Sequence, residues 1–439
     1  MKTKLILFLL FSVTYLFAQA RKIEFTEYTM DNGLHVILHQ DNNTPIVAVS
    51  IMYHVGSKNE DPERTGFAHF FEHLMFEGSK YIGRGEFDVI MESAGGINNA
   101  STSHDRTYYY EILPSNQLEL GLWIESERLL HAKIDTIGVE TQRKVVKEER
   151  RQNYDNQPYG SVIEETFKRA YREHPYNWLP IGSVQYIDEA TIDEFRDFYN
   201  TFYTPENATL VIAGDIDRDN TKSLVNKYFS DIPRGVHQIT RPNVIEPPLN
   251  GEVRDTVYDN IQLPLVLHAY RIPANGTKDA YPLELLTTLL SSGQSSRLRK
   301  SLVDNQQKAL NIGAFPYSLE DSGLFITYGI SNIGVTADEL EKAMQDELDK
   351  VINELITETE FQKLKNQIEN SFVSSNSTVA GIASSLATYH VLLDDANLIN
   401  TEIERYNAVT IEDLNRVAKE YLSQDNRVVL YYLPKSEEK

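Results

Sequence analysis

The 439-residue chain contains no cysteine, which excludes disulfide bonds and rules out a thiol as nucleophile or metal ligand. Any metal ion must therefore be held by histidine, aspartate or glutamate. Positive charge is also scarce, because 42 lysines and arginines stand against 64 aspartates and glutamates, a net charge of −22. This charge argues against a nucleic acid partner and would steer cationic substrates toward the chain, although solubility alone also explains it.

Apolar runs long enough to span a membrane are missing after the first twenty residues. Those twenty begin with two lysines near the start, continue through the largely apolar stretch Leu5–Phe17 and end in Ala18-Gln19-Ala20. The pattern is typical of a secretory signal peptide, so we expect residues 1–20 to be removed and the protein to be exported. A membrane anchor is the alternative, but it needs about 20 apolar residues. The lack of disulfides suits a periplasm, and an extracellular location stays open.

Glycine and proline gather between residues 233 and 251, which predicts a linker between two domains, residues 21–232 and 252–439. A domain of either length can bury a substantial core. The division also separates two segments that resemble each other.

A helix, an asparagine and a strand recur in the same order in both halves. Thr191 opens a helix with a capping box, Asn207 follows sixteen residues later, and an apolar strand comes next. Thr410 and Asn426 stand at the same spacing in the second half, again before an apolar run. Chance could supply the cap twice, but hardly all three features in register. We therefore expect two homologous domains.

Each half mixes strands and helices without strict alternation. In the first half we expect strands at residues 24–28, 35–38, 46–53, 97–102, 107–113 and 209–213, and helices at residues 66–76, 85–93, 116–130, 136–154 and 192–202. In the second half, a strand within residues 263–270 precedes a helix at residues 281–290 that carries leucine and threonine. The elements predict an α+β fold, in which each domain is an antiparallel-rich sheet covered by helices.

The segment His69-Phe70-Phe71-Glu72-His73 carries the metal chemistry. Two histidines four apart on a helix project from one face, close enough to bind one ion. Glu72 borders that face and could deprotonate a water held at the metal. Such a histidine pair alone is more often structural, but the full order His-x-x-Glu-His is that of the inverted zincins. We therefore predict one zinc ion per chain, with His69 and His73 as ligands and Glu72 as the catalytic base.

A catalytic zinc needs a third protein ligand and an open position. The helix expected at residues 136–154 offers Glu140, Glu148 and Glu149. Spacing alone does not choose among them, since acidic residues on a long helix usually form a solvated face.

Over its whole mature length the sequence resembles the short, two-repeat members of the M16 peptidases, the family of pitrilysin and the mitochondrial processing peptidase. In that family a glutamate ligand follows the motif by about 76 residues, within a helix that reads Arg-x-x-Val-x-x-Glu. Arg143, Val146 and Glu149 match this pattern. The resemblance therefore implies that Glu149 is the third zinc ligand, with Glu148 as the fallback.

A second match lies in Asn98-Asn99-Ala100-Ser101-Thr102-Ser103. In the family this is an edge strand beside the metal, and an extended substrate pairs with it through main-chain hydrogen bonds. The resemblance implies that Asn99 and Ala100 meet the peptide backbone next to the scissile bond. Without the family, the segment is only a strand after a Gly-Gly turn.

Two departures from the family pattern stand out. Gln142 occupies the position, seven residues before the distal ligand, where the family often has a second glutamate, so carboxylate assistance there is absent or shifted to Glu140. The family's second repeat often carries an arginine and a tyrosine seven apart that grip the substrate, but here Val303 and Leu310 or Asn311 stand in their places. Arg297 and Tyr317 are nearby but do not match the spacing.

The resemblance implies that the chain forms half of a clam-shell, as a homodimer or with a second family chain that carries the Arg/Tyr pair. We therefore expect a zinc metallopeptidase that hydrolyses peptides or unfolded polypeptides. The alternative is a poorly active subunit that binds peptides or scaffolds a complex. Gln142 and the missing pair favour this alternative, whereas the intact His-x-x-Glu-His motif argues against it.

Overall fold

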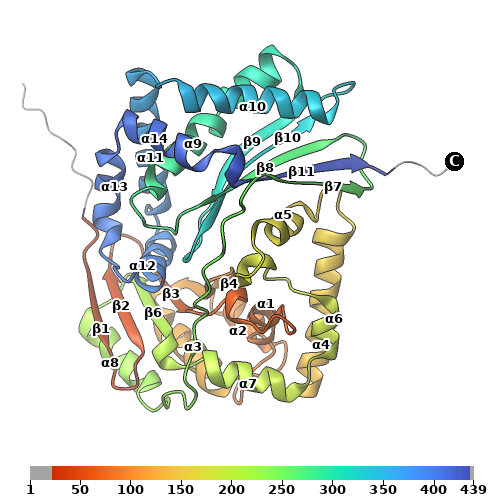
Figure 1. Cartoon of the computed structure of the whole chain (residues 1–439). Helices are drawn as coiled ribbons and strands as arrows, with labels where there is room; N and C mark the ends of the chain where they lie inside the picture. Colours follow the sequence, from red (N-terminus) through yellow and green to blue (C-terminus); the bar gives the residue numbers. More distant parts are fainter. Residues whose placement is uncertain (1–21, 436–439) are drawn as a thin grey trace, which may run out of the picture.

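The computed structural model describes residues 22–435, so the expected signal peptide lies outside the described residues. Two β-sheets dominate this part of the chain, one in each half, with helices on both faces of each (Figure 1). No helix between residues 22 and 435 is long and apolar enough to cross a membrane. The α+β prediction is confirmed.

The first sheet has six strands in the order β1-β2-β6-β3-β5-β4. Their bounds are β1 (Phe25–Thr29), β2 (His35–Gln40), β3 (Ile46–Tyr53), β4 (Ile97–Thr102), β5 (Thr107–Pro114) and β6 (Ala208–Gly214). All neighbours pair antiparallel except β2 and β6, which run parallel. The strand β4 lies at the edge of the sheet, so one side of its backbone has no neighbouring strand among the described residues.

The second sheet has five strands in the order β7-β11-β8-β10-β9. They are β7 (Val253–Asp259), β8 (Leu265–Ile272), β9 (Ala309–Tyr317), β10 (Gly323–Ser331) and β11 (Arg427–Pro434). Again one pair is parallel, β7 with β11, and the others are antiparallel. The order matches the last five strands of the first sheet, with β7, β11, β8, β10 and β9 in the places of β2, β6, β3, β5 and β4. The two halves therefore share one topology.

The first half contributes α1 (Phe67–Leu74), α2 (Glu86–Ser93), α3 (Leu118–His131), α4 (Thr136–Arg150), α5 (Val162–Ala170), α6 (Val184–Glu189), α7 (Ile192–Phe202) and α8 (Arg218–Phe229). The second contributes α9 (Ala280–Ser291), α10 (Ala337–Asn353), α11 (Glu358–Ser375), α12 (Val379–Leu393), α13 (Leu398–Ala408) and α14 (Ile411–Tyr421). The strand expectations hold to within two residues. The helix expected at residues 136–154 instead ends at Arg150 and continues as a wider π-type turn, Arg151–Asp155. Residues 233–251 contain neither helix nor strand.

The repeated cap is present in both halves. Thr191 at the start of α7 and Thr410 at the start of α14 each form a capping box with the third residue of the helix. The side-chain amide of Asn207 donates to the carbonyl of Phe202 at 2.8 Å, and that of Asn426 donates to the carbonyl of Tyr421 at 2.9 Å. Each asparagine therefore closes the turn between helix and strand in the same way.

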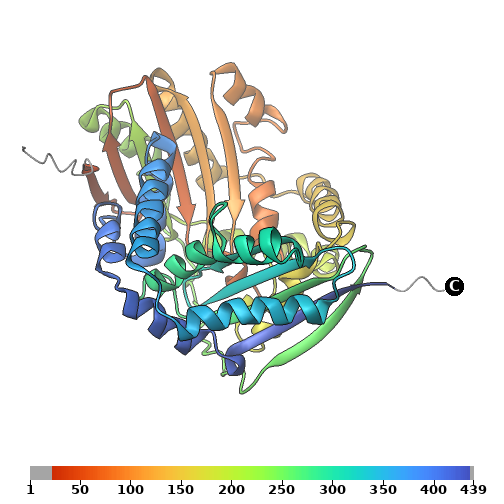
Figure 2. The same ribbon diagram turned by 90° about the horizontal axis from the view of Figure 1, so that it is seen from above.

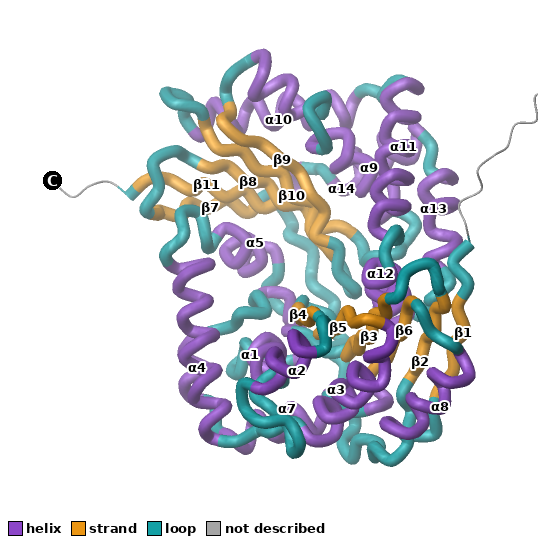
Figure 3. Tube along the Cα trace, turned by 180° about the vertical axis from the view of Figure 1, so that it is seen from behind, coloured by secondary structure: helices purple, strands orange, loops and turns teal. Residues whose placement is uncertain are grey.

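Each half contributes one helix that packs on the sheet of the other half. The helix α12 of the second half packs along β3 and β6 of the first sheet (Figure 2). In return, α5 of the first half packs against β8 and β11 of the second. The helices α3 and α10 cover the faces of the two sheets that point away from each other (Figure 3). Each sheet is thus enclosed between one helix layer of its own half and one helix from the other half.

Candidate metal and active site

The helix α1 carries the His-x-x-Glu-His motif and is held from several sides. Phe67 and Phe70 stack on Phe195 of α7, with ring centroids 4.6 and 4.5 Å apart. At its N-terminus the carboxylate of Glu60 accepts hydrogen bonds from the amides of Gly66 and Ala68, both at 2.8 Å. Burial raises the pKa of Glu60 to about 8. The apolar face of α1 is therefore fixed in the core, and the other face carries His69, Glu72 and His73.

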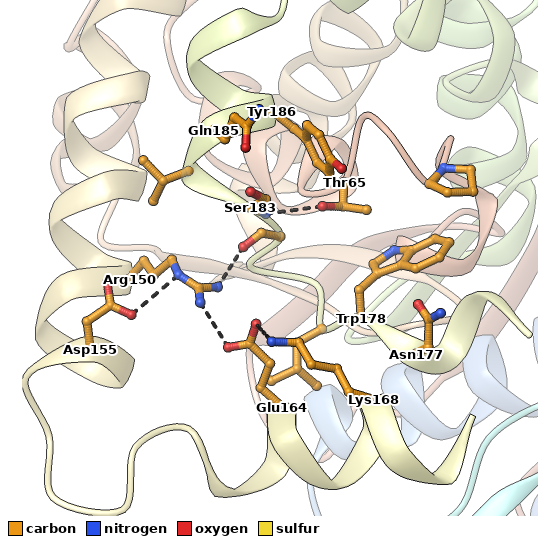
Figure 4. Close-up of a pocket in the computed structure, with 14 residues that line it drawn as sticks. Thr65, Arg150, Asp155, Glu164, Lys168, Asn177, Trp178, Ser183, Gln185 and Tyr186 are labelled. Atoms are coloured by element: carbon orange, nitrogen blue, oxygen red, sulfur yellow. Dashed lines mark hydrogen bonds and ion pairs between the residues drawn. The ribbon is translucent and has the colours of Figure 1, made fainter. Parts of the chain in front are cut away.

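A tight glycine contact holds the loop before α6 against the start of α1. Gly182 lies so close to Gly66 that an added Cβ would stand 2.3 Å from the Gly66 backbone. Arg150 of α4 fixes the same loop, because its guanidinium donates to the Gly182 carbonyl at 2.6 Å and to Glu164 of α5 at 2.9 Å (Figure 4). The loop that precedes α6 is thereby held against both α1 and α4.

His69, His73 and Glu149 meet at one point. The Nε2 atoms of His69 and His73 lie 3.5 and 3.1 Å from the same oxygen of Glu149, Oε2. Ligand atoms of all three residues lie within 4.8 Å of one another. Glu149 stands on the last turn of α4, which packs against α1. The structure thus brings together the two histidines and the glutamate that the family resemblance selects.

The spacing and the charge states of these donors fit a zinc ion. Two ligands at about 2.0 to 2.1 Å from a tetrahedral zinc stand about 3.3 Å apart, which matches both observed separations. Burial, with His73 nearby, lowers the pKa of His69 to about 4, so its imidazole is neutral at pH 7 and retains a lone pair. The neighbouring His73 lowers the pKa of Glu149, which keeps that carboxylate ionised. Imidazole nitrogens and a carboxylate oxygen are a donor set that zinc prefers.

Glu72 lines a cavity of about 440 Å³ together with His69 and Glu149. Burial raises the pKa of Glu72, while the Thr102 hydroxyl and His73 oppose this shift. A carboxylate with a raised pKa, placed beside a metal site, is a stronger base than an exposed one and is suited to accept a proton. The geometry therefore allows Glu72 the role that its place in the motif suggests.

The strand β4 borders the same cavity through Ala100, Ser101 and Thr102. Asn99 and Ala100 lie in the middle of this edge strand and pair on their inner side with Tyr110 and Tyr109 of β5. The outer side of β4 has no neighbouring strand among the described residues. An extended peptide could therefore add to the sheet here.

The other acidic candidates on α4 point elsewhere. Glu148 pairs with Arg151 and accepts a hydrogen bond from Gln152 at 2.7 Å. Glu140 pairs with Arg143 at 3.1 Å and is 56% exposed, so it does not replace a carboxylate at the position of Gln142. Gln142 instead donates to Glu77 at 2.7 Å. Its amide thereby ties α4 to the segment that follows α1.

The places where the family often has its arginine and tyrosine are apolar or exposed. Val303 is partly buried against the second core, and Leu310 on β9 is 61% exposed. Asn311 is exposed as well. Arg297 is held by Glu360, with nitrogen to oxygen distances of 3.1 and 3.0 Å. None of these four side chains lines the metal cavity.

A second group of donors, Glu27, His35 and His390, lies between β1, β2 and α12. The two imidazole rings are stacked, with centroids 3.7 Å apart and planes 8° from parallel. A nitrogen lone pair lies in the plane of its ring, so stacked rings do not direct their lone pairs at one point. This group therefore lacks the convergence that the first group has.

The sequence interpretation missed Glu60, which holds the start of α1, and Tyr154, and it named Tyr317 only as a residue that does not match the family spacing. Glu60 lies on the turn before α1, and no local pattern links it to the helix start. Tyr154 and Tyr317 also line the cavity, Tyr154 from the wide turn after α4 and Tyr317 from the end of β9. Tyr317 stands far from the motif in sequence, and only the packing of the two halves brings it there.

The order His-x-x-Glu-His, carried here on α1, is the motif of the inverted zincins. The profile described as "Insulinase (Peptidase family M16)" matches residues 35–179, and "Peptidase M16 inactive domain" matches residues 189–368. The chain belongs to peptidase family M16.

Close relatives support the assignment over nearly the whole chain. "Zinc protease PqqE" of Helicobacter pylori is 33% identical over 411 residues, 92% of each chain. "Uncharacterized zinc protease YmxG" of Bacillus subtilis is 25% identical over 406 residues, 92% of this chain and 97% of the relative. The crystal structure of a protease from Helicobacter pylori superposes with a TM-score of 0.90 at 30% identity, covering 94% of this chain and 100% of that chain.

Proposed function

We propose that this protein is a zinc metallopeptidase that hydrolyses peptides or unfolded polypeptides. The observation that carries the proposal is the meeting of His69, His73 and Glu149 at zinc-like separations beside the partly buried Glu72. The three donors would hold one zinc ion, which when bound would supply Lewis acidity to a water and to the peptide carbonyl. The names of the zinc protease relatives agree with this choice of metal.

Each residue of the site has a defined task. The peptide lies extended along β4, where Asn99 and Ala100 pair with its backbone. Glu72 takes the proton of the attacking water and returns it to the nitrogen of the leaving amine, so the carboxylate ends as it began. The walls formed by α1, α4 and the loop before α6 keep the carbonyl in line with this carboxylate.

The chain acts as an exported subunit, periplasmic in a cell with two membranes, and it pairs with a copy of itself or with a second M16 chain. The N-terminal pattern of charge and hydrophobicity supports export. The missing Arg/Tyr pair supports a partner that contributes it. The domain limits at residues 21–232 and 252–439 belong to the same proposal.

The variant Glu72→Gln tests the peptidase function. It should lose about 10²- to 10⁴-fold in turnover of a quenched peptide library, because it removes the proton acceptor, and it should keep its zinc because all three ligands remain. The matched control Glu148→Gln, on α4 but bound to Arg151 and Gln152, should retain both activity and zinc. Equal turnover in Glu72→Gln and wild type would refute the assignment.

The second candidate, a peptide-binding or scaffold subunit, is favoured by Gln142 and by the apolar residues at the Arg/Tyr positions. A zinc-loaded wild type that binds peptides but cleaves none, alone or mixed with a second M16 chain, would establish it.

A further inference from the structure

A second cavity, which we call the α4–α6 pocket, lies between α4, α5 and α6 (Figure 4). Its volume is about 650 Å³, within the range of about 300 to 1,000 Å³ that small-molecule sites usually have. Leu179 lines both this pocket and the metal cavity, whereas His69, Glu72 and Glu149 line only the metal cavity. The loop before α6 therefore separates two different hollows.

Four charged side chains of alternating sign form a row along one wall of the α4–α6 pocket (Figure 4). Arg150 lies 3.5 Å from Asp155 on one side and 2.9 Å from Glu164 on the other. Glu164 in turn lies 3.0 Å from Lys168, which also contacts Glu165 at 3.1 Å. Arg150 and Glu164 are therefore paired on both sides, while Asp155 and Lys168 stand at the two ends of the row.

The two ends of the row keep capacity for a further partner. The side chain of Asp155 is 50% exposed and has one ion-pair contact among the described residues, at Oδ1. The side chain of Lys168 is 47% exposed, and its ammonium has three N–H donors for two carboxylates. Contacts of 3.5, 2.9 and 3.0 Å link the row, so its ends lie on the order of 10 Å apart, which roughly two to four extended residues span. The row therefore suits a ligand with an ammonium at one end and a carboxylate at the other.

Two aromatic rings line the pocket above and to the right of this row (Figure 4). The indole nitrogen of Trp178 donates to the Ser57 carbonyl at 3.0 Å and to Glu60 at 3.2 Å, which fixes the orientation of that ring. The second ring belongs to Tyr186 on α6, and its hydroxyl has no hydrogen-bond partner among the described residues. The side-chain amide of Asn177 likewise bonds to none of them. The rings can pack on an aromatic side chain, and the hydroxyl and the amide can bind a peptide group.

The walls of the pocket are held in place before any ligand arrives. Arg150 donates to the Gly182 carbonyl at 2.6 Å, and the amide of Ser183 donates to the Thr65 hydroxyl at 3.1 Å. These bonds join the loop before α6 to the end of α4 and to the segment that leads into α1. A ligand therefore meets a preformed site, and little ordering entropy opposes its binding.

We propose that the α4–α6 pocket binds a short peptide of about two to four residues that has free ends and an aromatic side chain. The ammonium of the peptide pairs with Asp155, its carboxylate pairs with Lys168, and its aromatic side chain packs on Trp178 and Tyr186. Binding is reversible, and no covalent bond forms or breaks. The inference goes beyond the proposed peptidase function, because this pocket contains neither the metal donors nor Glu72.

Tryptophan fluorescence can report on this pocket, because the chain has two tryptophans, Trp123 and Trp178. The parent protein for the test carries Trp123→Phe, which leaves Trp178 as the single tryptophan, and Glu72→Gln, which prevents hydrolysis of the probe. Titration of the zinc-loaded parent with alanyl-phenylalanyl-alanine should change its emission in a saturable way. The same tripeptide with an acetylated amino end and an amidated carboxyl end should bind at least about 10-fold more weakly, because it carries neither charge.

Two further substitutions in the parent test the ends of the row. Lys168→Met and Asp155→Asn should each weaken binding of the free tripeptide by about 10- to 100-fold, because each removes a charge-assisted hydrogen bond. The loss in Asp155→Asn should disappear for the acetylated tripeptide, and the loss in Lys168→Met should disappear for the amidated one. Lys147→Met is the matched control, since Lys147 pairs with Asp188 and does not line the pocket, and it should bind as the parent does.

Three results would overturn the proposal: no saturable change in emission, equal binding by the parent and both row variants, or equal binding of the free and the doubly blocked tripeptide. Equal binding by the variants would place the peptide elsewhere, such as in the metal cavity. The blocked tripeptides need no substitution in the row, so this comparison decides the matter even if a variant unfolds. Turnover is not the readout, so none of these results alters the peptidase proposal, which the activity of Glu72→Gln tests separately.

Discussion

Helices α1 and α9 occupy equivalent places after β3 and β8, yet they differ in what they expose. The helix α1 buries its phenylalanines, and its residues His69 and Glu72 line a cavity. Most of α9 is buried, including five leucines and Thr287. The helix α1 therefore has one polar face beside the cavity, whereas α9 is part of the hydrophobic core of the second half. The comparison indicates that this fold supports a metal site at this position only where the segments packed around the helix leave space beside it.

Removing a donor from α1 should produce the largest effect. His69→Ala should lose its zinc on dialysis and at least about 10³-fold of its peptidase activity, because two ligands do not hold a catalytic zinc. Metal content by atomic absorption and a melting curve in chelator would separate metal loss from unfolding. His390→Ala, from the stacked pair on α12, should retain its zinc. Loss of zinc in His390→Ala instead would mean that the stacked group is a metal site.

Truncating the core of α9 should affect stability and leave metal binding unchanged. Leu286 is 1% exposed, so Leu286→Ala should lower the free energy of unfolding by about 2 to 5 kcal/mol through lost burial and a cavity. Urea denaturation measures this, and zinc per folded chain should stay at one. The exposed Leu310→Ala should change stability by less than about 0.5 kcal/mol. A large zinc loss in Leu286→Ala would contradict the division of roles.

Acid should lower the free energy of unfolding through His104, which is buried at the turn between β4 and β5. Burial lowers the pKa of His104 to about 3, with His174 and Lys58 adding to the effect against the hydrogen bond to the Trp178 carbonyl. The unfolded chain takes up this proton near pH 6.5, well before the folded chain. Stability is therefore complete above about pH 6.5 and falls by up to about 1.4 kcal/mol per pH unit below it.

Denaturation of wild type and His104→Asn between pH 7 and 5, both in chelator, measures this contribution. The wild-type curve should fall more steeply with acid, because the variant has no imidazole to protonate. Parallel curves would show that His104 does not contribute to the acid sensitivity.

The helix caps should show the smallest difference, because there the two halves are alike. Thr191→Ala and Thr410→Ala each remove one capping box, so each should cost about 1 kcal/mol of stability. The serine variants keep the hydroxyl and serve as controls. A cost confined to one half would break the equivalence of the repeats.

Local patterns predicted the parts of the fold that local physics determines. The bounds of β3, β4 and α7 agree with the expected ones, since a β-branched run, a Gly-Gly turn and a capping box mark them. The helices α5 and α8 were not anticipated, although the buried residues of each lie on one face. The wide turn at Arg151–Asp155 interrupts a continuous helical pattern, and only tertiary contacts such as the Arg150 pair with Glu164 explain where α4 ends.

Local sequence likewise predicted some residues of the candidate site, whereas others depend on tertiary packing. The order His-x-x-Glu-His is readable from the sequence because its residues share one helix face. The choice of Glu149 over Glu148 needed the family resemblance, and the structure shows why spacing failed: neighbouring residues on α4 point about 100° apart, one at the histidines and one at Arg151. Glu60 and Tyr317 reach the site only through tertiary packing, which leaves no trace in local sequence.

The exchange of α5 and α12 makes the two halves inseparable. Without α12, the first sheet would expose Ile37, Ala48, Met52, Val211 and Ala213 to water. Without α5, the second sheet would expose the apolar residues of β8 and β11 that now pack on Phe167. Expression of either half alone should therefore give an aggregating fragment, whereas a protease cut within residues 233–251 should leave two pieces that migrate together until denatured. The two halves are similar in topology, but neither should work as an independent module once the other is removed.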